Sequence, residues 1–351
     1  MPTPTLPTAT MHAAVMQGFG QPLALLDLPL PTPGADEVLL EVQACGVCHS
    51  DLHIIDGDTP GFKAGTKPQL IPGHEVVGTV VARGADVGHL ALGQRVGVAW
   101  LHHACGVCEQ CREGLENLCR KGTVTGMMVD GGYAEYMCAK ASHALPVPDA
   151  LSSADAAPLF CAGVTSYRAL KNAGVHAGQR VAVIGIGGLG HLAVQIALAA
   201  GAEVIALDVA EDKLAAARAL GAAHAFDARS PETPRAVRAL GGAHVAVVTS
   251  AARAAYDLAL KCLRPAGTLS VVGLPPEPLA FSALQLVSGE YRIMGSAVGT
   301  RDDLRATLAL AAAGQLHCHN ETRPLAQVNA VLDQMRAGHI QGRIVLTCGG
   351  V

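Results

Sequence analysis

Hydrophobic and polar positions in the first part of this chain form short runs of the kind found in β-strands. β-branched residues cluster at 38–42, 76–81 and 95–98, and glycine, proline or charged residues separate the clusters. Such runs predict a β-rich, turn-rich region whose first strand begins at Met11. Near the C-terminus, a helical segment is followed by an expected closing strand at 343–346.

A different pattern begins near residue 165, where buried strands alternate with helices. The strands 180–185 and 203–208 are each followed by a segment with helical spacing, at 191–200 and 211–220. Further strands are expected at 246–249 and 268–273. This alternation predicts an α/β fold with a doubly wound parallel sheet, the Rossmann arrangement.

Composition and charge narrow the class of protein. The chain has 351 residues, more than one ordinary core needs, so two domains are expected. A formal net charge of −4 gives no basic surface for nucleic acid, and no charge-free apolar run is long enough to span a membrane.

The 11 cysteines, without a secretion signal, favour a reducing cytoplasm in which thiolates bind metal. Residues 1–10, rich in proline and threonine, are expected to form a flexible extension.

Four cysteines follow the spacing C-x2-C-x2-C-x7-C, at Cys105, Cys108, Cys111 and Cys119. Short loops of this kind bring four thiolates to the corners of a tetrahedron, which is the geometry of a closed structural Zn²⁺ site. An iron–sulfur cluster is a rival interpretation, but it usually brings a second cysteine group or a proline after the last cysteine, where Arg120 stands. Free or buried cysteines are the third interpretation.

The strand that ends at Gly185 runs into G-I-G-G-L-G, and the next helix begins at once. Gly185 permits the tight turn, Gly187 lets a pyrophosphate approach the backbone, and Gly190 lets the helix pack on the strand. Asp208 ends the next strand, where a carboxylate accepts from both ribose hydroxyls and repels a 2′-phosphate. The motif therefore predicts dinucleotide binding with NAD favoured over NADP. The alternative is a turn without a ligand and an aspartate that caps the next helix.

Three more motifs each supply one candidate metal ligand. They are G-V-C-H-S-D-L-H at 46–53, G-H-E at 73–75 and L-F-C-A-G-V-T-S-Y at 159–167. The candidate ligands are Cys48, His74 and Cys161. Two thiolates and one imidazole leave the fourth position of a zinc ion open to water or substrate, which is typical of a catalytic site. Taken singly, such a residue is more often part of a core.

Together and in this order, these motifs resemble the zinc-dependent, medium-chain alcohol dehydrogenases, and above all the tetrameric bacterial and yeast type. The similarity runs from about Met11 to the C-terminus and includes the late G-R-I-V. It implies a GroES-like, zinc-binding catalytic domain formed by 11–161 and 300–351, and a dinucleotide-binding Rossmann domain formed by 162–299. The implied protein is a cytoplasmic homotetramer that holds two Zn²⁺ per chain and oxidises primary or secondary alcohols with NAD, or catalyses the reverse reaction.

The resemblance also implies roles for individual residues. Ser50 would accept the substrate proton and pass it through the cofactor ribose to His53. His53 can serve as the outer proton donor or acceptor because imidazole titrates near neutral pH. Asp51 would bind the far nitrogen of His74, and Glu75 would assist water exchange at the zinc. The expected cofactor contacts are His49 and Arg343 at the phosphates, Thr165 at the nicotinamide, and Gly185, Gly187, Gly188, Leu189, Gly190, Asp208, Lys213 and Val298.

The substrate pocket departs from the ethanol-preferring members of that family. Trp100 stands where the yeast-like members have a substrate-facing tryptophan, but Ile55 and Thr59 stand where bulky aromatics are common. Smaller side chains predict a wider pocket for longer or aromatic alcohols, unless Ile55 simply packs the wall. Cys45 is expected to be a packing residue, with a Cys45–Cys48 redox pair as the alternative.

Two other functions agree with parts of the sequence. A cinnamyl-type, NADP-dependent aldehyde reductase shares the glycine turn but tends to carry a small polar residue at the position of Asp208. A non-catalytic zinc- and nucleotide-binding protein is the rival from another class. The complete ligand set and the Ser50–His53 pair disfavour it.

Overall fold

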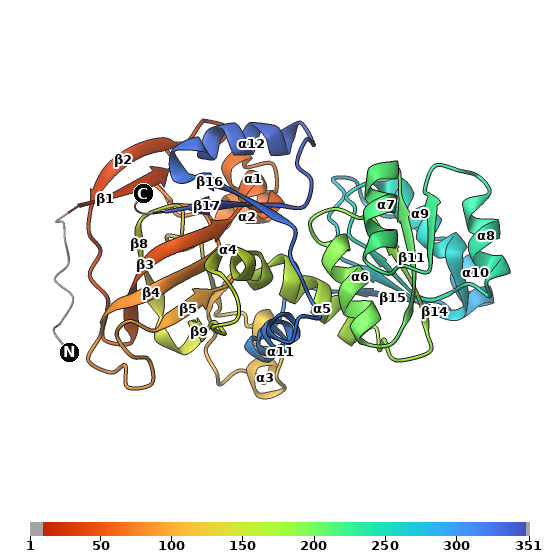
Figure 1. The fold of residues 1–351 in the computed structure, drawn as a ribbon, viewed down its shortest axis with the longest axis horizontal. Coiled ribbons are helices and arrows are strands. Elements are labelled where there is room, and N and C mark those ends of the chain that lie inside the picture. The colour runs from red at the N-terminus through yellow and green to blue at the C-terminus, as the bar shows by residue number, and fades with distance from the viewer. Residues whose placement is uncertain (1–9, 349–351) are drawn as a thin grey trace. The chain divides into compact units, whose positions relative to one another are not determined.

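The computed structural model describes residues 10–348, so almost all of the predicted N-terminal extension lies outside the described residues. Contacts within the chain divide it into two compact units. Unit 1 comprises 1–161, 300–312 and 318–351, and unit 2 comprises 162–299 and 313–317. Figure 1 shows the elements of each unit.

Unit 1 is built on a mixed sheet of seven strands. Its order is β16 (Asn320–Pro324), β17 (Arg343–Thr347), β3 (Glu37–Gly46), β4 (Glu75–Arg83), β5 (Arg95–Val98) and β9 (Leu145–Pro146), with β8 (Tyr136–Lys140) paired to β3. Two-stranded pairs are formed by β1 (Thr10–Val15) with β2 (Ala24–Pro29), and by β6 (Leu101–His103) with β7 (Thr123–Val124). Most of these pairs are antiparallel, as expected for a region of short runs joined by turns.

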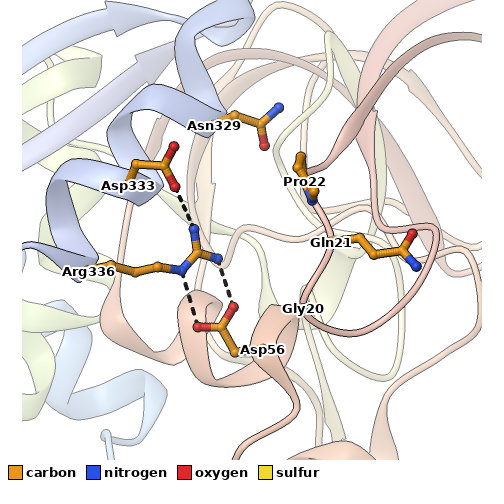
Figure 2. Close-up of a pocket in the computed structure, with 7 residues that line it drawn as sticks. All are labelled: Gly20, Gln21, Pro22, Asp56, Asn329, Asp333 and Arg336. Carbon is orange, nitrogen blue, oxygen red and sulfur yellow. Dashed lines mark hydrogen bonds and ion pairs between the residues drawn. The ribbon is translucent and has the colours of Figure 1, made fainter.

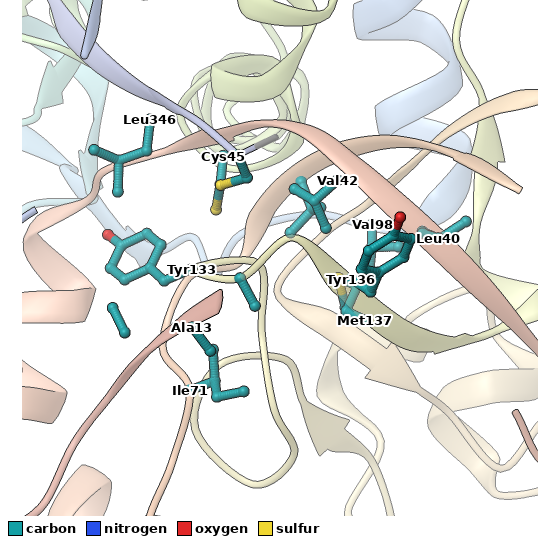
Figure 3. Close-up of a cluster of buried hydrophobic side chains, with 14 of the residues drawn as sticks. Ala13, Leu40, Val42, Cys45, Ile71, Val98, Tyr133, Tyr136, Met137 and Leu346 are labelled. Atoms are coloured by element: carbon teal, nitrogen blue, oxygen red, sulfur yellow. The ribbon is translucent and has the colours of Figure 1, made fainter. Parts of the chain in front are cut away.

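Short helices connect and cover these strands. They are α1 (His49–Asp56), α2 (Pro60–Gly65), α3 (Glu109–Arg112), α4 (Ser153–Ala156), α11 (Arg301–Ala312), α12 (Val328–Arg336) and the 3₁₀ turns η1 (Glu116–Leu118), η2 (Ala141–His143), η3 (Ala157–Phe160) and η4 (Leu325–Gln327). The core between them consists mainly of Val, Leu, Ile and Ala, and Tyr133 is its largest fully buried side chain. Cys45 lies in this core, as expected of a packing residue (Figure 3).

Unit 2 is a six-stranded sheet in which all the strands are parallel. Its order is β12 (His224–Asp227), β11 (Glu203–Asp208), β10 (Arg180–Ile184), β13 (Ala243–Val248), β14 (Leu263–Val271) and β15 (Arg292–Gly295). Helix α5 (Ala162–Asn172) precedes the first strand, and the crossover helices are α6 (Gly190–Ala199), α7 (Glu211–Ala219), α8 (Thr233–Ala239), α9 (Arg253–Cys262) and α10 (Ala283–Gly289) (Figure 1). The first strand lies in the middle and the order reverses beside it, which is the Rossmann order. The predicted fold class is confirmed.

One boundary differs from the sequence prediction. Residues 313–317 belong to unit 2 rather than to the catalytic part of the chain. The Gln195 amide of α6 donates to the carbonyl of His317 at 2.9 Å and accepts the His317 N–H at 2.8 Å. These reciprocal bonds hold the segment in unit 2, and they join positions 122 apart in sequence, a separation over which no local pattern predicts a bond. Within residues 10–348, no helix combines the length and apolar character needed to cross a membrane.

Candidate metal and nucleotide sites

Four buried side chains that can bind metal converge in unit 1. They are Cys48, His74, Glu75 and Cys161, whose ligand atoms all lie within 4.8 Å of one another. Cys48 is the N-cap of α1, Glu75 begins β4 directly after His74, and Cys161 follows η3. The structure therefore brings together the three ligands proposed from sequence and adds the Glu75 carboxylate to the same cluster.

The chemistry of this cluster fits a zinc ion. The Sγ atoms of Cys48 and Cys161 are 4.0 Å apart, close to the roughly 3.8 Å separation that tetrahedral bonds of about 2.3 Å imply. His74 Nε2 and Glu75 Oε2 are buried and have no hydrogen-bond partner among the described residues. Such orphaned atoms are costly, and a cation would satisfy both. The thiol of Cys161 and, more weakly, His74 lower the pKa of Cys48 well below its usual value, which favours the thiolate that zinc binds.

Asp51 sets the direction of the His74 ring. Its Oδ1 lies 3.0 Å from His74 Nδ1, so the carboxylate accepts from that nitrogen and leaves Nε2 free to bind metal. Its Oδ2 accepts the backbone N–H of Cys48 at 2.9 Å, which is the N-terminal capping interaction of α1. One carboxylate thus orients two of the candidate ligands.

The Glu75 carboxylate forms a buried ion pair with the Arg343 guanidinium. Burial raises the pKa of Glu75 to about 7, although the neighbouring Arg343 guanidinium acts in the opposite direction and donates to the carboxylate. The resemblance assigned Arg343 to the cofactor phosphates, whereas here it is 4% exposed and bonded to Glu75. Gly46 makes room for this pair, because a Cβ there would lie 1.9 Å from Glu75 Oε2.

The four cysteines of the C-x2-C-x2-C-x7-C motif form a second cluster, half-buried in unit 1. Their Sγ atoms also lie within 4.8 Å of one another, and those of Cys108 and Cys119 are 3.9 Å apart. Hydrogen bonds from the backbone N–H groups of Val107 and Cys108 lower the pKa of Cys105 to about 6. Four thiols can fill all four positions of a tetrahedral ion, so this cluster fits a closed structural metal site.

An ion pair ties this cysteine loop to the C-terminal part of unit 1. Arg301, the first residue of α11, donates from its backbone N–H and its guanidinium to the Glu116 carboxylate, at 2.6 to 3.1 Å. The same guanidinium donates to the carbonyl of Ser142 at 2.8 Å. The loop is therefore fixed at a point between Cys111 and Cys119.

In unit 2, the glycine-rich turn has the geometry that a dinucleotide needs. Gly185 has φ +91°, a conformation that L side chains rarely adopt. A Cβ at Gly190 would lie 1.9 Å from the carbonyl of Gly185, so the helix can approach the strand only with glycine there. A Cβ at Gly187 would meet no described atom within 4 Å, so the backbone is accessible where the pyrophosphate is expected.

Asp208 is held at the end of β11 by three backbone donors. Its carboxylate accepts the N–H groups of Ile186 at 2.6 Å, Val209 at 2.7 Å and Ala210 at 3.0 Å. The carboxylate therefore lies beside the glycine turn, as expected of a ribose-binding group. The other proposed cofactor residues of unit 2 are Thr165 in α5, Gly188 and Leu189 in the turn, Lys213 in α7 and Val298, whose φ is +43°.

The proposed relay residues lie on α1 with Cys48. His53 Nδ1 is 2.9 Å from the Asp58 carboxylate, a partner that sequence reasoning missed because an aspartate in a turn carries no distinctive signal. Ser50 lies in the first turn of the same helix. His49 precedes it, and burial lowers the pKa of His49, which favours a neutral ring rather than the basic group expected near the pyrophosphate.

Aromatic rings cover the metal cluster on one side. The rings of Trp100 and His74 have centroids 4.9 Å apart, and Phe62 lies 5.6 Å from Trp100 and 6.5 Å from His53. Trp100 is thus beside the site as expected, and Phe62 joins it. Phe62 could not be proposed from sequence, because it lies in a short glycine-containing helix outside every motif.

The structure corrects the proposed role of Ile55. This side chain has no exposed surface and belongs to the hydrophobic core of unit 1, so it does not line an open pocket. The helical repeat explains the difference, because Leu52 and Ile55 are three positions apart on one buried face of α1. Thr59, which is half-buried, donates to the Asp58 carboxylate at 3.0 Å.

A separate cavity of about 270 Å³ lies elsewhere in unit 1. Figure 2 shows Arg336 between Asp56 and Asp333, with nitrogen–oxygen distances of 2.7 Å and 2.8 Å. The described lining contains none of the proposed metal or cofactor residues. Both of its aspartates pair with the one arginine, so none of these charged groups lacks a partner.

Comparison with known proteins agrees with this geometry. Residues 34–149 match the family model "Alcohol dehydrogenase GroES-like domain", and residues 188–313 match "Zinc-binding dehydrogenase". An alcohol dehydrogenase of Geobacillus stearothermophilus is 44% identical over 339 residues, which cover 96% of this chain and 99% of that protein.

Solved structures give the same result. The acetophenone reductase of Geotrichum candidum, in complex with NAD, has a TM-score of 0.87 at 34% identity and covers 97% of this chain and 98% of its own. The alcohol dehydrogenase of Aeropyrum pernix also has a TM-score of 0.87 at 34% identity, covering 96% and 99%.

The fold and the two clusters define a zinc-binding dehydrogenase. More narrowly, the chain belongs to the zinc-type medium-chain alcohol dehydrogenase family. It is an oxidoreductase that acts on alcohols or, in reverse, on carbonyl compounds.

Proposed function

We propose that this protein is an NAD-dependent alcohol dehydrogenase with two zinc ions per chain. Cys48, His74 and Cys161 would hold the catalytic ion, and the four cysteines of the C-x2-C-x2-C-x7-C loop would hold the structural one. The observation that carries the proposal is the buried cluster, in which two thiols face an imidazole nitrogen and a carboxylate oxygen that lack partners among the described residues. The homotetramer suggested by the family resemblance belongs to this proposal.

The residues of the chain would divide the work of alcohol oxidation. Bound zinc supplies a Lewis acid for the alcohol oxygen, and bound nicotinamide supplies the hydride acceptor. Ser50 would take the hydroxyl proton, and His53 would release it to solvent. Asp58, 2.9 Å from His53 Nδ1, would stabilise the protonated imidazole during that transfer.

The preference for NAD rests on Asp208. Its carboxylate is fixed beside the glycine turn by three N–H groups, so a ribose in that turn would meet a negative charge in a defined place. Two ribose hydroxyls can donate to it, whereas a 2′-phosphate would be repelled.

The test compares kcat/KM for NAD and NADP during oxidation of ethanol, hexanol and benzyl alcohol. Wild type should prefer NAD, and Asp208→Ser should shift the preference toward NADP. Asp227→Ser is a matched control, because Asp227 ends β12 in register with Asp208 but has its carboxylate bonded to Arg229 at the surface. A wild type that prefers NADP would favour the cinnamyl-type reductase instead.

A further inference from the structure

The Asp51 carboxylate accepts a hydrogen bond from Tyr133, a residue outside the motifs that supply the metal ligands. The side chain of Asp51 is completely buried, and besides the Cys48 N–H and the His74 ring it accepts a hydrogen bond from the Tyr133 hydroxyl at 2.8 Å. Tyr133 is 82 positions away in sequence and is completely buried. Without this hydroxyl, Oδ2 would keep only the Cys48 N–H, and the carboxylate would lose part of what fixes its rotation.

Tyr133 also contacts the backbone that leads into His74. Its N–H donates to the carbonyl of Pro72 at 3.0 Å, and the preceding Gly132 N–H donates to the carbonyl of Gly73, also at 3.0 Å. The ring lies against Gly73, since a Cβ on Gly73 would come within 2.5 Å of it. Gly73 has φ +97°, so this close approach and this turn both require glycine.

The segment 130–133 is itself fixed to the same loop. The Asp130 carboxylate accepts the Ile71 N–H at 3.0 Å, and the Gly131 N–H donates to the Ile71 carbonyl at 2.7 Å. Residues 130–133 therefore run alongside 71–73 and hold the loop before His74. Tyr133 extends this contact from the backbone of the loop to the carboxylate that orients the His74 ring.

We propose that Tyr133 is a positioning residue of the catalytic metal site. Its ring and backbone fix the loop that leads into His74, and its hydroxyl fixes Asp51, which bonds to His74 Nδ1, so that Nε2 is held in place for a metal. The proposal rests on the proposed zinc site of unit 1. Loss of groups that orient a metal-bound histidine typically lowers metal affinity by about 10- to 100-fold.

The test measures zinc affinity of Tyr133→Phe by competition with a chelator, starting from the zinc-loaded protein. This substitution removes one oxygen and keeps the ring that packs on Gly73. The catalytic zinc should dissociate about tenfold more readily than in wild type, while the zinc of the four-cysteine loop is retained. With Co²⁺ in the catalytic site, the visible absorption bands should shift, because they report the geometry of the ligands.

Tyr256→Phe is the matched control. Tyr256 is also completely buried, and its hydroxyl donates to the carbonyl of Gly273 in unit 2. A general loss of stability from removing a buried hydroxyl should affect both variants, but only Tyr133→Phe should change zinc affinity and the cobalt spectrum. Equal zinc affinities and spectra in the two variants would overturn the proposal.

A double-mutant cycle separates positioning from a general effect. If Tyr133 acts through Asp51, the loss of zinc affinity caused by Tyr133→Phe should disappear in an Asp51→Asn background. Additive losses would show that the hydroxyl does not act through the carboxylate. Failure of the proposed function would look different, because wild type itself would then bind no zinc at Cys48, His74 and Cys161.

Discussion

Arg343 donates a hydrogen bond to the carboxylate of Glu75, and both side chains are buried beside Cys48. The two residues are 268 positions apart in sequence, so this ion pair joins the closing strand β17 to the start of β4. A buried carboxylate next to metal ligands needs a counter-charge, and Arg343 supplies it.

Removing Arg343 should therefore destabilise the protein. Arg343→Ala leaves the buried carboxylate without its cation, and we expect a loss of about 3 kcal/mol or more in the free energy of unfolding, measured with urea on the zinc-loaded protein. Arg336→Ala is the control, since the Arg336–Asp56 pair is partly exposed and should contribute less than about 1 kcal/mol. Equal losses of stability in the two variants would contradict the assignment of Arg343 as the counter-charge of Glu75.

His143 should make stability depend on pH. Burial lowers the pKa of His143 from 6.5 to about 4, and its Nε2 accepts the N–H of Ala104 at 3.1 Å. Because the unfolded chain binds the proton more readily, this contribution is complete above pH 6.5 and is lost as the pH falls toward 4. The loss should reach about 3 kcal/mol at the low end.

His143→Gln tests this dependence. The amide oxygen of glutamine can still accept from Ala104, but it does not titrate. As the pH falls from 7 to 4, the free energy of unfolding of wild type should drop relative to that of the variant by about 3 kcal/mol, because only wild type loses this contribution. A difference in the free energy of unfolding that does not change with pH would show that the pKa of His143 is not lowered in the folded protein.

His53 should matter for turnover mainly near neutral pH. His53→Gln removes the proposed proton acceptor, so alcohol oxidation should slow by up to about 100-fold near pH 7 and less at high pH, where hydroxide takes the proton directly. His12→Gln is a matched control, since His12 is also paired with an aspartate, Asp27, but is exposed on β1. An unchanged pH–rate profile in His53→Gln would remove His53 from the relay.

The metal and nucleotide clusters could be proposed from the sequence because their residues lie in short motifs. Three of the four sulfurs of the cysteine loop come from seven consecutive positions, and the glycine turn immediately follows a buried strand. In both, local chain geometry dictates the arrangement. The fold class followed for a similar reason, since strand and helix periods are local properties.

The residues that were missed act over long separations or without a motif. Tyr133 reaches Asp51 across 82 positions, and Phe62 meets Trp100 only because α2 lies beside that part of unit 1. The family resemblance places Ile55 in the substrate pocket, but the helical repeat of α1 turns its side chain into the core. Side-chain direction on a short helix depends on packing, which a family position alone does not reveal.

Elemental analysis of the purified protein is the most direct test of the central assignment. The account predicts close to two zinc ions per chain in wild type and close to one in a Cys48→Ser, Cys161→Ser double variant, with activity lost. The remaining ion should disappear when Cys108 and Cys111 are also changed to serine. Iron in place of zinc, or an unchanged zinc content in the first variant, would contradict the assignment of a catalytic zinc to Cys48, His74 and Cys161.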